Sequence, residues 1–321
     1  MTPKPLALTL GDPDGIGPEI ALRAWLALRE TGPEFLLFGS EAAAAQAAAL
    51  TGAPEPRPDA RFQDAPVLRA TDAALSGAAS AVCAIEDAVA AVRGGEACAL
   101  ATAPISKARA YKAGFRHPGH TEFIARLTAD MPFSGVRGPV MMLACPELRT
   151  ALVSIHTSLR EAIETLTAEA IIHTAQVTHE ALRRDFGIDR PRLALAGLNP
   201  HAGEGGALGR EEIDIVVPAA ESLRAQGLDI SGPHAPDSLF HAAARTRYDA
   251  AVCLYHDQGL IPVKTIDING GVNVTLGLPV VRTSPDHGTA DDIAWKGQAD
   301  PSSLIAAIRL AAALAARRAA A

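Results

Sequence analysis

The sequence predicts an α/β fold with a mostly parallel sheet, and three observations support this. Short apolar runs of strand length alternate with longer segments of helical periodicity. Several apolar runs end in histidine or in a glycine-rich turn, as expected where strands deliver functional groups to one edge of a sheet. At 321 residues and 48% hydrophobic content, the chain is long enough for two domains with sizeable cores.

The chain is expected to begin with a strand over residues 6–10. A turn with three glycines follows at 11–19, where Pro18 and Glu19 begin a helix that runs to about Arg29. This turn is either an ordinary tight turn or a loop whose amides hold an anion, and its spacing is not that of the dinucleotide fingerprint. Further expected elements are a strand at 34–38, a helix at 81–92 and a strand at 97–102.

An irregular segment at 117–122 contains two histidines and a threonine, which is unusual for a plain linker. It either contacts a substrate or begins a helix with Thr121 as the N-cap. Lys107, which follows the strand at 97–102, is either a surface lysine or a lysine in a cleft.

Three histidines follow three apolar runs that are expected to be strands. His156 follows residues 152–155, His201 follows 193–198 and two further residues, and His256 follows 250–255. The separations of 45 and 55 residues are too long for a local metal finger and suit ligands gathered by a parallel sheet. Three imidazoles with an open coordination position predict a catalytic divalent-metal site. Three unrelated histidines would give the same pattern in a chain with ten of them.

Composition limits the remaining possibilities. The formal charge of −7, without a basic run, argues against nucleic acid as a partner. Each of the four cysteines stands alone in an apolar run and is expected to be a small buried hydrophobe: Cys83, Cys98, Cys145 and Cys253. No apolar run has the length of a signal-peptide core or of a membrane-spanning helix. We therefore expect a cytoplasmic protein that contacts no membrane.

The later part of the chain adds two helices. Glu211 and Glu212 open a helix after the glycine loop 203–206, and a last helix at 301–318 is expected to pack beside the N-terminal strands. No low-complexity linker marks a domain boundary.

Several motifs are specific in combination. They are residues 11–19, Gly119-His120-Thr121-Glu122, residues 199–206, Tyr255-His256-Asp257-Gln258, and residues 272–279 with Arg282-Thr283-Ser284. Together they closely resemble the 4-hydroxythreonine-4-phosphate dehydrogenase family of pyridoxal phosphate biosynthesis, over almost the whole chain. Residues 286–297 also look like the cofactor loop of isopropylmalate dehydrogenases.

The resemblance implies an isocitrate/isopropylmalate dehydrogenase-like fold with two α/β/α domains and a cleft between them. Residues 1–130 and 273–321 would form one domain, with both termini and the cofactor loop, and 131–272 the other, with the metal ligands and the contacts of a homodimer. The implied reaction is oxidation of 4-(phosphooxy)-L-threonine to 2-amino-3-oxo-4-(phosphooxy)butanoate, which decarboxylates to 3-amino-2-oxopropyl phosphate. It would use NAD, with NADP possible, and one divalent metal ion per site, Zn, Mg or Co.

The resemblance also implies a role for individual residues. The metal ligands are His156, His201 and His256, and the substrate contacts are His120, Thr121, Lys264, Asn273 and Arg282. Proton transfer falls to Lys264, Asp257 and Asp237, and cofactor binding to His287, Gly288, Thr289 and Asp292.

Three residues depart from the family pattern, and they are Asp14, Asp291 and Trp295. Acidic Asp291 and Asp292 would repel an extra phosphate on the adenosine ribose, so we expect NAD to be preferred to NADP. On the same reasoning, Asp291→Lys would shift the preference toward NADP.

Two other functions fit part of this pattern. A sister dehydrogenase for D-threonate or D-erythronate 4-phosphate would share all these motifs. A non-redox phosphate acyltransferase or metal hydrolase of the same broad fold is more distant, because the cofactor-like loop after Asp286 argues for a dehydrogenase. A pure scaffold has no use for three histidines after strands.

Overall fold

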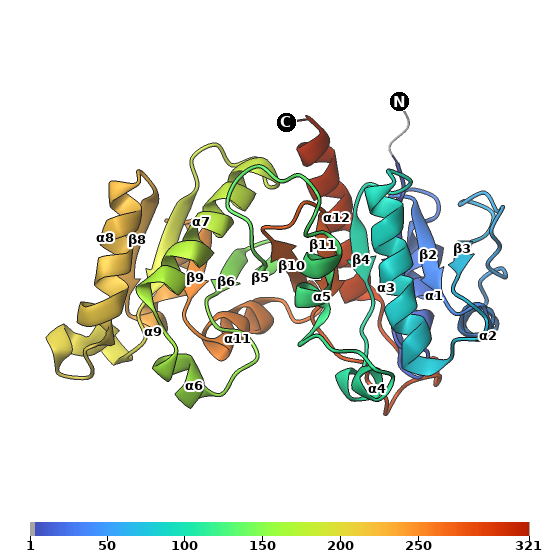
Figure 1. The fold of residues 1–321 in the computed structure, drawn as a ribbon, viewed down its shortest axis with the longest axis horizontal. Coiled ribbons are helices and arrows are strands. Elements are labelled where there is room, and N and C mark those ends of the chain that lie inside the picture. The colour runs from blue at the N-terminus through green and yellow to red at the C-terminus, as the bar shows by residue number, and fades with distance from the viewer. Residues whose placement is uncertain (1–3, 321) are drawn as a thin grey trace. The chain divides into compact units, whose positions relative to one another are not determined.

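The computed structural model describes residues 4–320, and these divide into two compact units (Figure 1). The first unit contains the described residues up to Pro132 together with Leu278–Ala320, and the second is Phe133–Gly277. The chain thus crosses between units after residues 132 and 277, where the sequence suggested 130 and 272. None of the helices in residues 4–320 is both long enough and apolar enough to cross a membrane.

The first unit is built on five parallel strands in the order β3-β2-β1-β4-β11. They are β1 Leu6–Thr9, β2 Phe35–Gly39, β3 Val67–Ala70, β4 Leu100–Thr102 and β11 Arg282–Pro285. The strands β1, β2, β4 and β11 are buried along their whole length, as expected for a parallel sheet covered on both faces.

Helices cover both faces of this sheet (Figure 1). They are α1 Gly17–Leu28, α2 Glu41–Thr51, α3 Gly77–Arg93, α4 Lys107–Lys112, α5 His120–Leu127 and α12 Ser302–Ala320. Apolar residues of α3 and α5 share one core cluster with β1, β2 and β4. Helix α12 packs against α1 and against β11, β4 and β1, which confirms its expected place beside the N-terminal strands.

The second unit has a mixed sheet in the order β10-β5-β6-β9-β7-β8. Its strands are β5 Val140–Cys145, β6 Leu148–Leu152, β7 Arg192–Ala196, β8 Asp229–His234, β9 Ala250–Cys253 and β10 Val272–Leu276. Strand β5 pairs antiparallel with both β10 and β6, and the remaining pairings are parallel.

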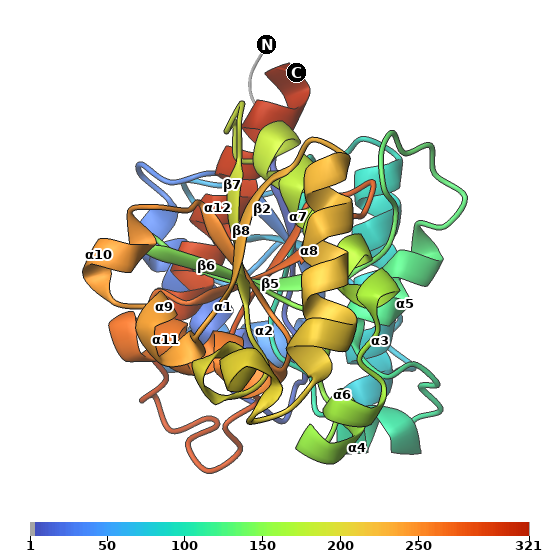
Figure 2. The ribbon, with the colours of Figure 1, turned by 90° about the vertical axis from the view of Figure 1, so that its left-hand side faces the viewer.

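The helices of the second unit lie around this sheet (Figure 2). They are α6 Leu159–Glu164, α7 Ala168–Arg184, α8 Val217–Ala225, α9 Pro236–Leu239, α10 Ala242–Arg245 and α11 His256–Ile266, with a 3₁₀ segment at Pro200–Gly206 and a π turn at Glu212–Val216. Helix α11 packs against β6, β5 and β9, which fixes the direction of its first turn.

The expected elements exist, but several of their ends differ from the sequence-based bounds. Strand β6 ends at Leu152, so His156 follows it by four residues instead of terminating it. Strand β9 ends at Cys253, and His256 is the first residue of α11. The N-cap of α5 is Gly119 and not Thr121, which lies inside the first turn. Cys83 and Cys98 are only partly buried, whereas Cys145 and Cys253 are buried as expected.

The glycine-rich turn between β1 and α1 is shaped by contacts with its own chain. A Cβ atom on Gly17 would collide with the carbonyl oxygen of Leu10, and one on Gly11 with that of Pro104. Gly11 also has a φ of +73°, which favours glycine. The sequence left two interpretations open, a tight turn and an anion-binding loop. These contacts favour the tight turn, because they explain why glycine occupies these positions without invoking a ligand.

Replacing Gly17 by alanine should therefore destabilise the protein, because the methyl group meets backbone that cannot move aside. Overpacking of this kind costs about 1–3 kcal/mol, and chemical denaturation followed by circular dichroism measures it. Gly288→Ala is the control, since a Cβ atom there meets nothing within 4 Å. Equal unfolding midpoints for the two variants would contradict this account of the turn.

Candidate functional site

The first unit contains a buried cation, Arg282, at the start of β11. Its side chain is 3% exposed, and one Nη atom donates to the hydroxyl of Thr102 over 2.7 Å. Burial lowers the pKa of Arg282 to about 10, and the nearby carboxylate of Glu122 opposes this shift. Arg282 is therefore still a cation at neutral pH, in a buried place near the carboxylate of Glu122.

His120 lies at the first position of α5 and belongs to the same electrostatic cluster. Its Nε2 atom is buried and has no hydrogen-bond partner among the described residues. Burial lowers the pKa of His120 to about 3, and the positive charges of Arg282 and Lys107 lower it further in the same sense. The imidazole is thus neutral in the working pH range, and an unsatisfied buried nitrogen indicates a place for a ligand.

The helix start supports the same interpretation. The chain is extended at Gly119, the N-cap of α5, and Thr121 follows His120 in the first turn. An atom added as a Cβ on Gly119 would lie 3.7 Å from the Nζ of Lys107, so this lysine reaches over the helix start. The positive charges of Arg282 and Lys107 both act on His120, and such a combination of groups suits a phosphate or carboxylate.

The second unit brings together two of the three predicted metal ligands. The ring centroids of His156 and His256 are 5.6 Å apart. Val153 and Ser154 still donate to the carbonyls of Cys253 and Leu254, which carries the parallel pairing beyond β6 and draws the two histidines together. Residues of both loops line one open pocket, including His156, Thr157, Tyr255 and His256.

Asp257 orients one of these imidazoles. Its Oδ1 atom lies 2.7 Å from Nδ1 of His256, which directs Nε2 of the ring away from this carboxylate. A carboxylate on the far nitrogen is the usual support of a metal-binding histidine. A neighbouring pocket is lined by His256, Asp257 and Lys264, so α11 presents all three side chains on one face.

The described structure does not gather His201 with this pair into a metal site. Among residues 4–320, no group of three His, Cys, Asp or Glu side chains lies close enough to hold a metal ion. His201 is exposed and has a φ of +52°, and the left-handed conformation continues through Ala202, Gly203, Glu204 and Gly205. For residues other than glycine this conformation costs about 1 kcal/mol or more each, and such strain is concentrated at functional sites.

Glu212 holds this strained turn, and sequence reasoning did not assign it a role. Its side chain is 3% exposed and accepts hydrogen bonds from the amides of Leu198 and Asn199, at 2.7 and 2.8 Å. It also accepts from Nδ2 of Asn199 at 2.9 Å. The only signal in the sequence was an acidic pair at the start of a helix. Acidic residues at this position are usually explained by their favourable interaction with the helix dipole.

The other predicted residues of the second unit are more dispersed. Asn273 lies on β10, and its Oδ1 atom is buried without a hydrogen-bond partner in the described chain. Asp237 is exposed in the first turn of the four-residue helix α9.

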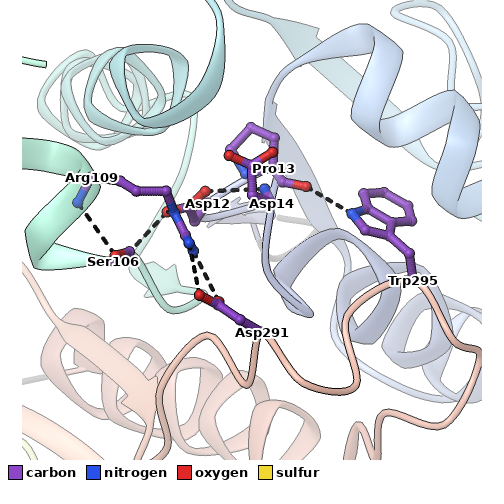
Figure 3. A network of polar contacts seen from close by, with 7 residues as sticks. All are labelled: Asp12, Pro13, Asp14, Ser106, Arg109, Asp291 and Trp295. Atoms are coloured by element: carbon purple, nitrogen blue, oxygen red, sulfur yellow. Dashed lines mark hydrogen bonds and ion pairs between the residues drawn. The ribbon is translucent and has the colours of Figure 1, made fainter. Parts of the chain in front are cut away.

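The loop after β11 is fixed at several points while part of it faces solvent. The carbonyl of Thr289 accepts from the amide of Ile16 at 3.0 Å. Nε1 of Trp295 donates to the carbonyl of Pro13 at 3.1 Å (Figure 3). Trp295 adopts a φ of +62°, which is rare for a bulky residue. The predicted cofactor residues His287, Gly288 and Asp292 are exposed.

Known proteins resemble the chain over its whole length. A model of the family described as pyridoxal phosphate biosynthetic protein PdxA matches residues 34–311. The chain is 55% identical to 4-hydroxythreonine-4-phosphate dehydrogenase of Caulobacter vibrioides over 331 aligned positions, which cover 99% of both chains. The crystal structure of 4-hydroxythreonine-4-phosphate dehydrogenase from Klebsiella pneumoniae is similar with a TM-score of 0.84 and 38% identity, covering 98% of each chain.

A more remote structure bears on the fold alone. Isocitrate dehydrogenase from Methylococcus capsulatus matches with a TM-score of 0.50 at 15% identity, covering 94% of this chain and 83% of that one. The predicted isocitrate dehydrogenase-like fold is thereby confirmed. The match of the family model and the identity over full length together establish that the chain belongs to the PdxA family of pyridoxal phosphate biosynthetic proteins.

Proposed function

We propose that the protein is an NAD-dependent dehydrogenase that oxidises 4-(phosphooxy)-L-threonine to 2-amino-3-oxo-4-(phosphooxy)butanoate. The product then loses carbon dioxide to give 3-amino-2-oxopropyl phosphate. Family membership supports the reaction class, and one observation in the structure supports the substrate class. This is the buried Nε2 atom of neutral His120, which has no hydrogen-bond partner among the described residues and lies in the field of the positive charges of Arg282 and Lys107, a combination that suits a hydrogen-bonding anion.

In this proposal Arg282 binds the phosphate or carboxylate of the substrate through its planar fork, and Thr102 holds the fork in place. His120 stays neutral and hydrogen-bonds the same anion through Nε2. Thr121, Lys264 and Asn273 are the further proposed substrate contacts. Because His120 carries no charge, its contribution does not vanish at alkaline pH.

The metal is proposed at His156, His201 and His256. The residues present fit this in part, since two imidazoles face each other at 5.6 Å and Asp257 supports one of them. The chemistry that a bound Zn, Mg or Co ion supplies at such a site is a lower pKa of the substrate hydroxyl, and bound NAD or NADP supplies the hydride acceptor. Lys264, Asp257 and Asp237 are proposed to move protons, with Lys264 and Asp257 lining one pocket.

The nucleotide is proposed to bind the loop after β11 through His287, Gly288, Thr289 and Asp292. Gly288 supports this, because it has no Cβ and the space where a Cβ would lie is open, which lets a nucleotide approach the backbone closely. The ties of this loop to the turn at Pro13 and Ile16 would hold it ready for the ligand.

A homodimer is also proposed, with its contacts in the second unit. Ile261 and Ile268 expose 62% and 73% of their surface, and both line the pocket that contains Lys264. Exposed isoleucines that line an open pocket favour an interface that covers them.

Formation of NADH with a panel of substrates tests the reaction. Purified protein with a divalent metal ion should reduce NAD in the presence of 4-(phosphooxy)-L-threonine, measured by absorbance, and more efficiently than with D-threonate or D-erythronate 4-phosphate. A reversed order of kcat/KM would assign the protein to the sister activity, and no NADH with any of them would exclude the dehydrogenase.

Replacing any one of the three proposed ligands by alanine should lower the bound metal and reduce turnover about 100-fold or more: His156→Ala, His201→Ala or His256→Ala. Losing a metal ligand should reduce activity more than losing a residue that only supports a ligand, which already costs about 10–100-fold. Elemental analysis and NADH formation measure the two effects. His179→Gln on α7 is a matched control in the same unit and should keep both. Normal metal content in any of the three alanine variants would remove that histidine from the ligand set.

Arg282→Lys should reduce kcat/KM by about one to two orders of magnitude, because lysine keeps the charge but loses the fork that binds an anion. The loss should be smaller for a substrate analogue without the phosphate. Wild-type steady-state constants in this variant would show that Arg282 serves the packing of β11 only.

Ile261→Asp and Ile268→Asp should shift the protein from dimer to monomer in analytical ultracentrifugation, since a buried carboxylate in an apolar interface costs several kcal/mol. Leu50→Asp is the control, an exposed apolar residue on α2 of the first unit. A dimer that persists in both isoleucine variants would place the interface elsewhere.

A further inference from the structure

Asp12, Arg109 and Asp291 form a chain of ion pairs beside the loop that follows β11 (Figure 3). We call these three residues the clasp. Asp291 is one of the residues that depart from the family pattern, so its partner in the structure bears on what is particular to this protein.

Asp12 fixes the position of Arg109. The Asp12 carboxylate is fully buried and accepts from Nε of Arg109 at 2.8 Å. The amides of Asp14 and Ser106 donate to the same carboxylate at 3.0 and 3.2 Å. An arginine held through Nε presents its two terminal nitrogens in a set direction, which here is toward the loop.

Asp291 occupies those two nitrogens. Its carboxylate accepts from both Nη atoms of Arg109 at 2.7 and 3.0 Å, in the bidentate geometry that arginine also offers to phosphate. The Asp291 side chain is 54% exposed and that of Arg109 is 28% exposed. The pair therefore lies where a ligand could reach it, and Arg109 holds the pKa of Asp291 down at about 2, so the pair stays ionised at neutral pH.

The loop does not depend on Asp291 alone for its position. The Ile16–Thr289 hydrogen bond and the bond from Trp295 to Pro13 tie it to the first turn, and Nη2 of Arg23 donates to the carbonyl of Gly297 at 2.8 Å. Neutralising Asp291 should therefore release the Arg109 fork without releasing the loop.

We propose that Asp291 sets the choice of nucleotide by occupying Arg109, and that without it Arg109 is a ready receptor for the extra phosphate of NADP. This rests on the proposed function, in which the loop binds the adenosine half of the nucleotide. It changes the expectation drawn from the sequence. Asp12 occupies Nε of Arg109 and Asp291 occupies both Nη atoms, so masking of this cation, more than direct repulsion by Asp291, disfavours NADP.

The variant that isolates this effect is Asp291→Asn, which keeps the size of the side chain and removes its charge. Asp291→Lys is less informative, because it places a second cation against Arg109. Asp130→Asn is the matched control: it removes the same kind of bidentate pair, with Arg93 at 2.6 and 2.7 Å, from a part of the first unit outside the clasp.

The experiment measures equilibrium dissociation constants for NAD and NADP by calorimetry, without substrate. We expect wild type and Asp130→Asn to prefer NAD. Asp291→Asn should shift the ratio of the two constants about tenfold toward NADP, since a charge-assisted bidentate contact becomes available. In the double variant Asp291→Asn/Arg109→Gln, the ratio of the two constants should move most of the way back to the wild-type value.

Three outcomes would overturn the proposal. The first is an unmoved ratio in Asp291→Asn, the second is a shift that persists without Arg109, and the third is an equal shift in Asp130→Asn. If the double variant does not fold, the salt dependence of binding is measured instead. NADP binding to Asp291→Asn should weaken with ionic strength more steeply than NAD binding does, and equal dependence of the two dissociation constants on ionic strength rejects the proposal. Wild type that binds neither nucleotide would refute the proposed cofactor together with this inference, whereas NAD binding with an unmoved ratio refutes this inference alone.

Discussion

The burial of the Asp12 carboxylate is the constraint on which the loops around the first unit's sheet depend. A charge fully removed from water is tolerated only when donors surround it, and here they come from the turn after β1, from the start of α4 and from Arg109. The turn and the short helix α4 must therefore meet at one point. The same requirement directs the Nη atoms of Arg109 outward, where they bind Asp291 in the loop after β11, far away in the sequence.

Both loops with proposed roles in binding share a physical pattern. His201 and Trp295 each adopt a left-handed backbone conformation that glycine would adopt at less cost. In each case a hydrogen bond from elsewhere holds the loop, through Glu212 in the second unit and the carbonyl of Pro13 in the first. Strain that is maintained by specific contacts keeps a side chain in a position that the local sequence would not choose.

Most of the fold could be predicted from the sequence, because its elements carry local signals. Pro18 and Glu19 marked the start of α1, and apolar runs marked the strands. The ends of strands could not be predicted, since Val153 and Ile155 stay apolar beyond the last residue of β6 and the backbone pairing itself continues to Ser154. The roles of Glu212 and Arg109 were missed because their partners are set by tertiary structure: Asp291 lies 182 residues from Arg109. Spacing could place three histidines after three strands, but which of them meet depends on the backbone of the loops.

The buried cysteines give the second unit its own chemical reporter of opening. Cys145 and Cys253 lie on buried strands of the second unit, and burial raises the pKa of the Cys253 thiol. Cys83 and Cys98 belong to the first unit and are partly exposed. A thiol reagent needs both access and a thiolate, so it reaches the first pair in the native state and the second pair only when the sheet around β5 and β9 opens. Labelling rates at the second pair, with the first pair as a native-state reference, would therefore follow local opening of the second unit in the native chain and without an added probe.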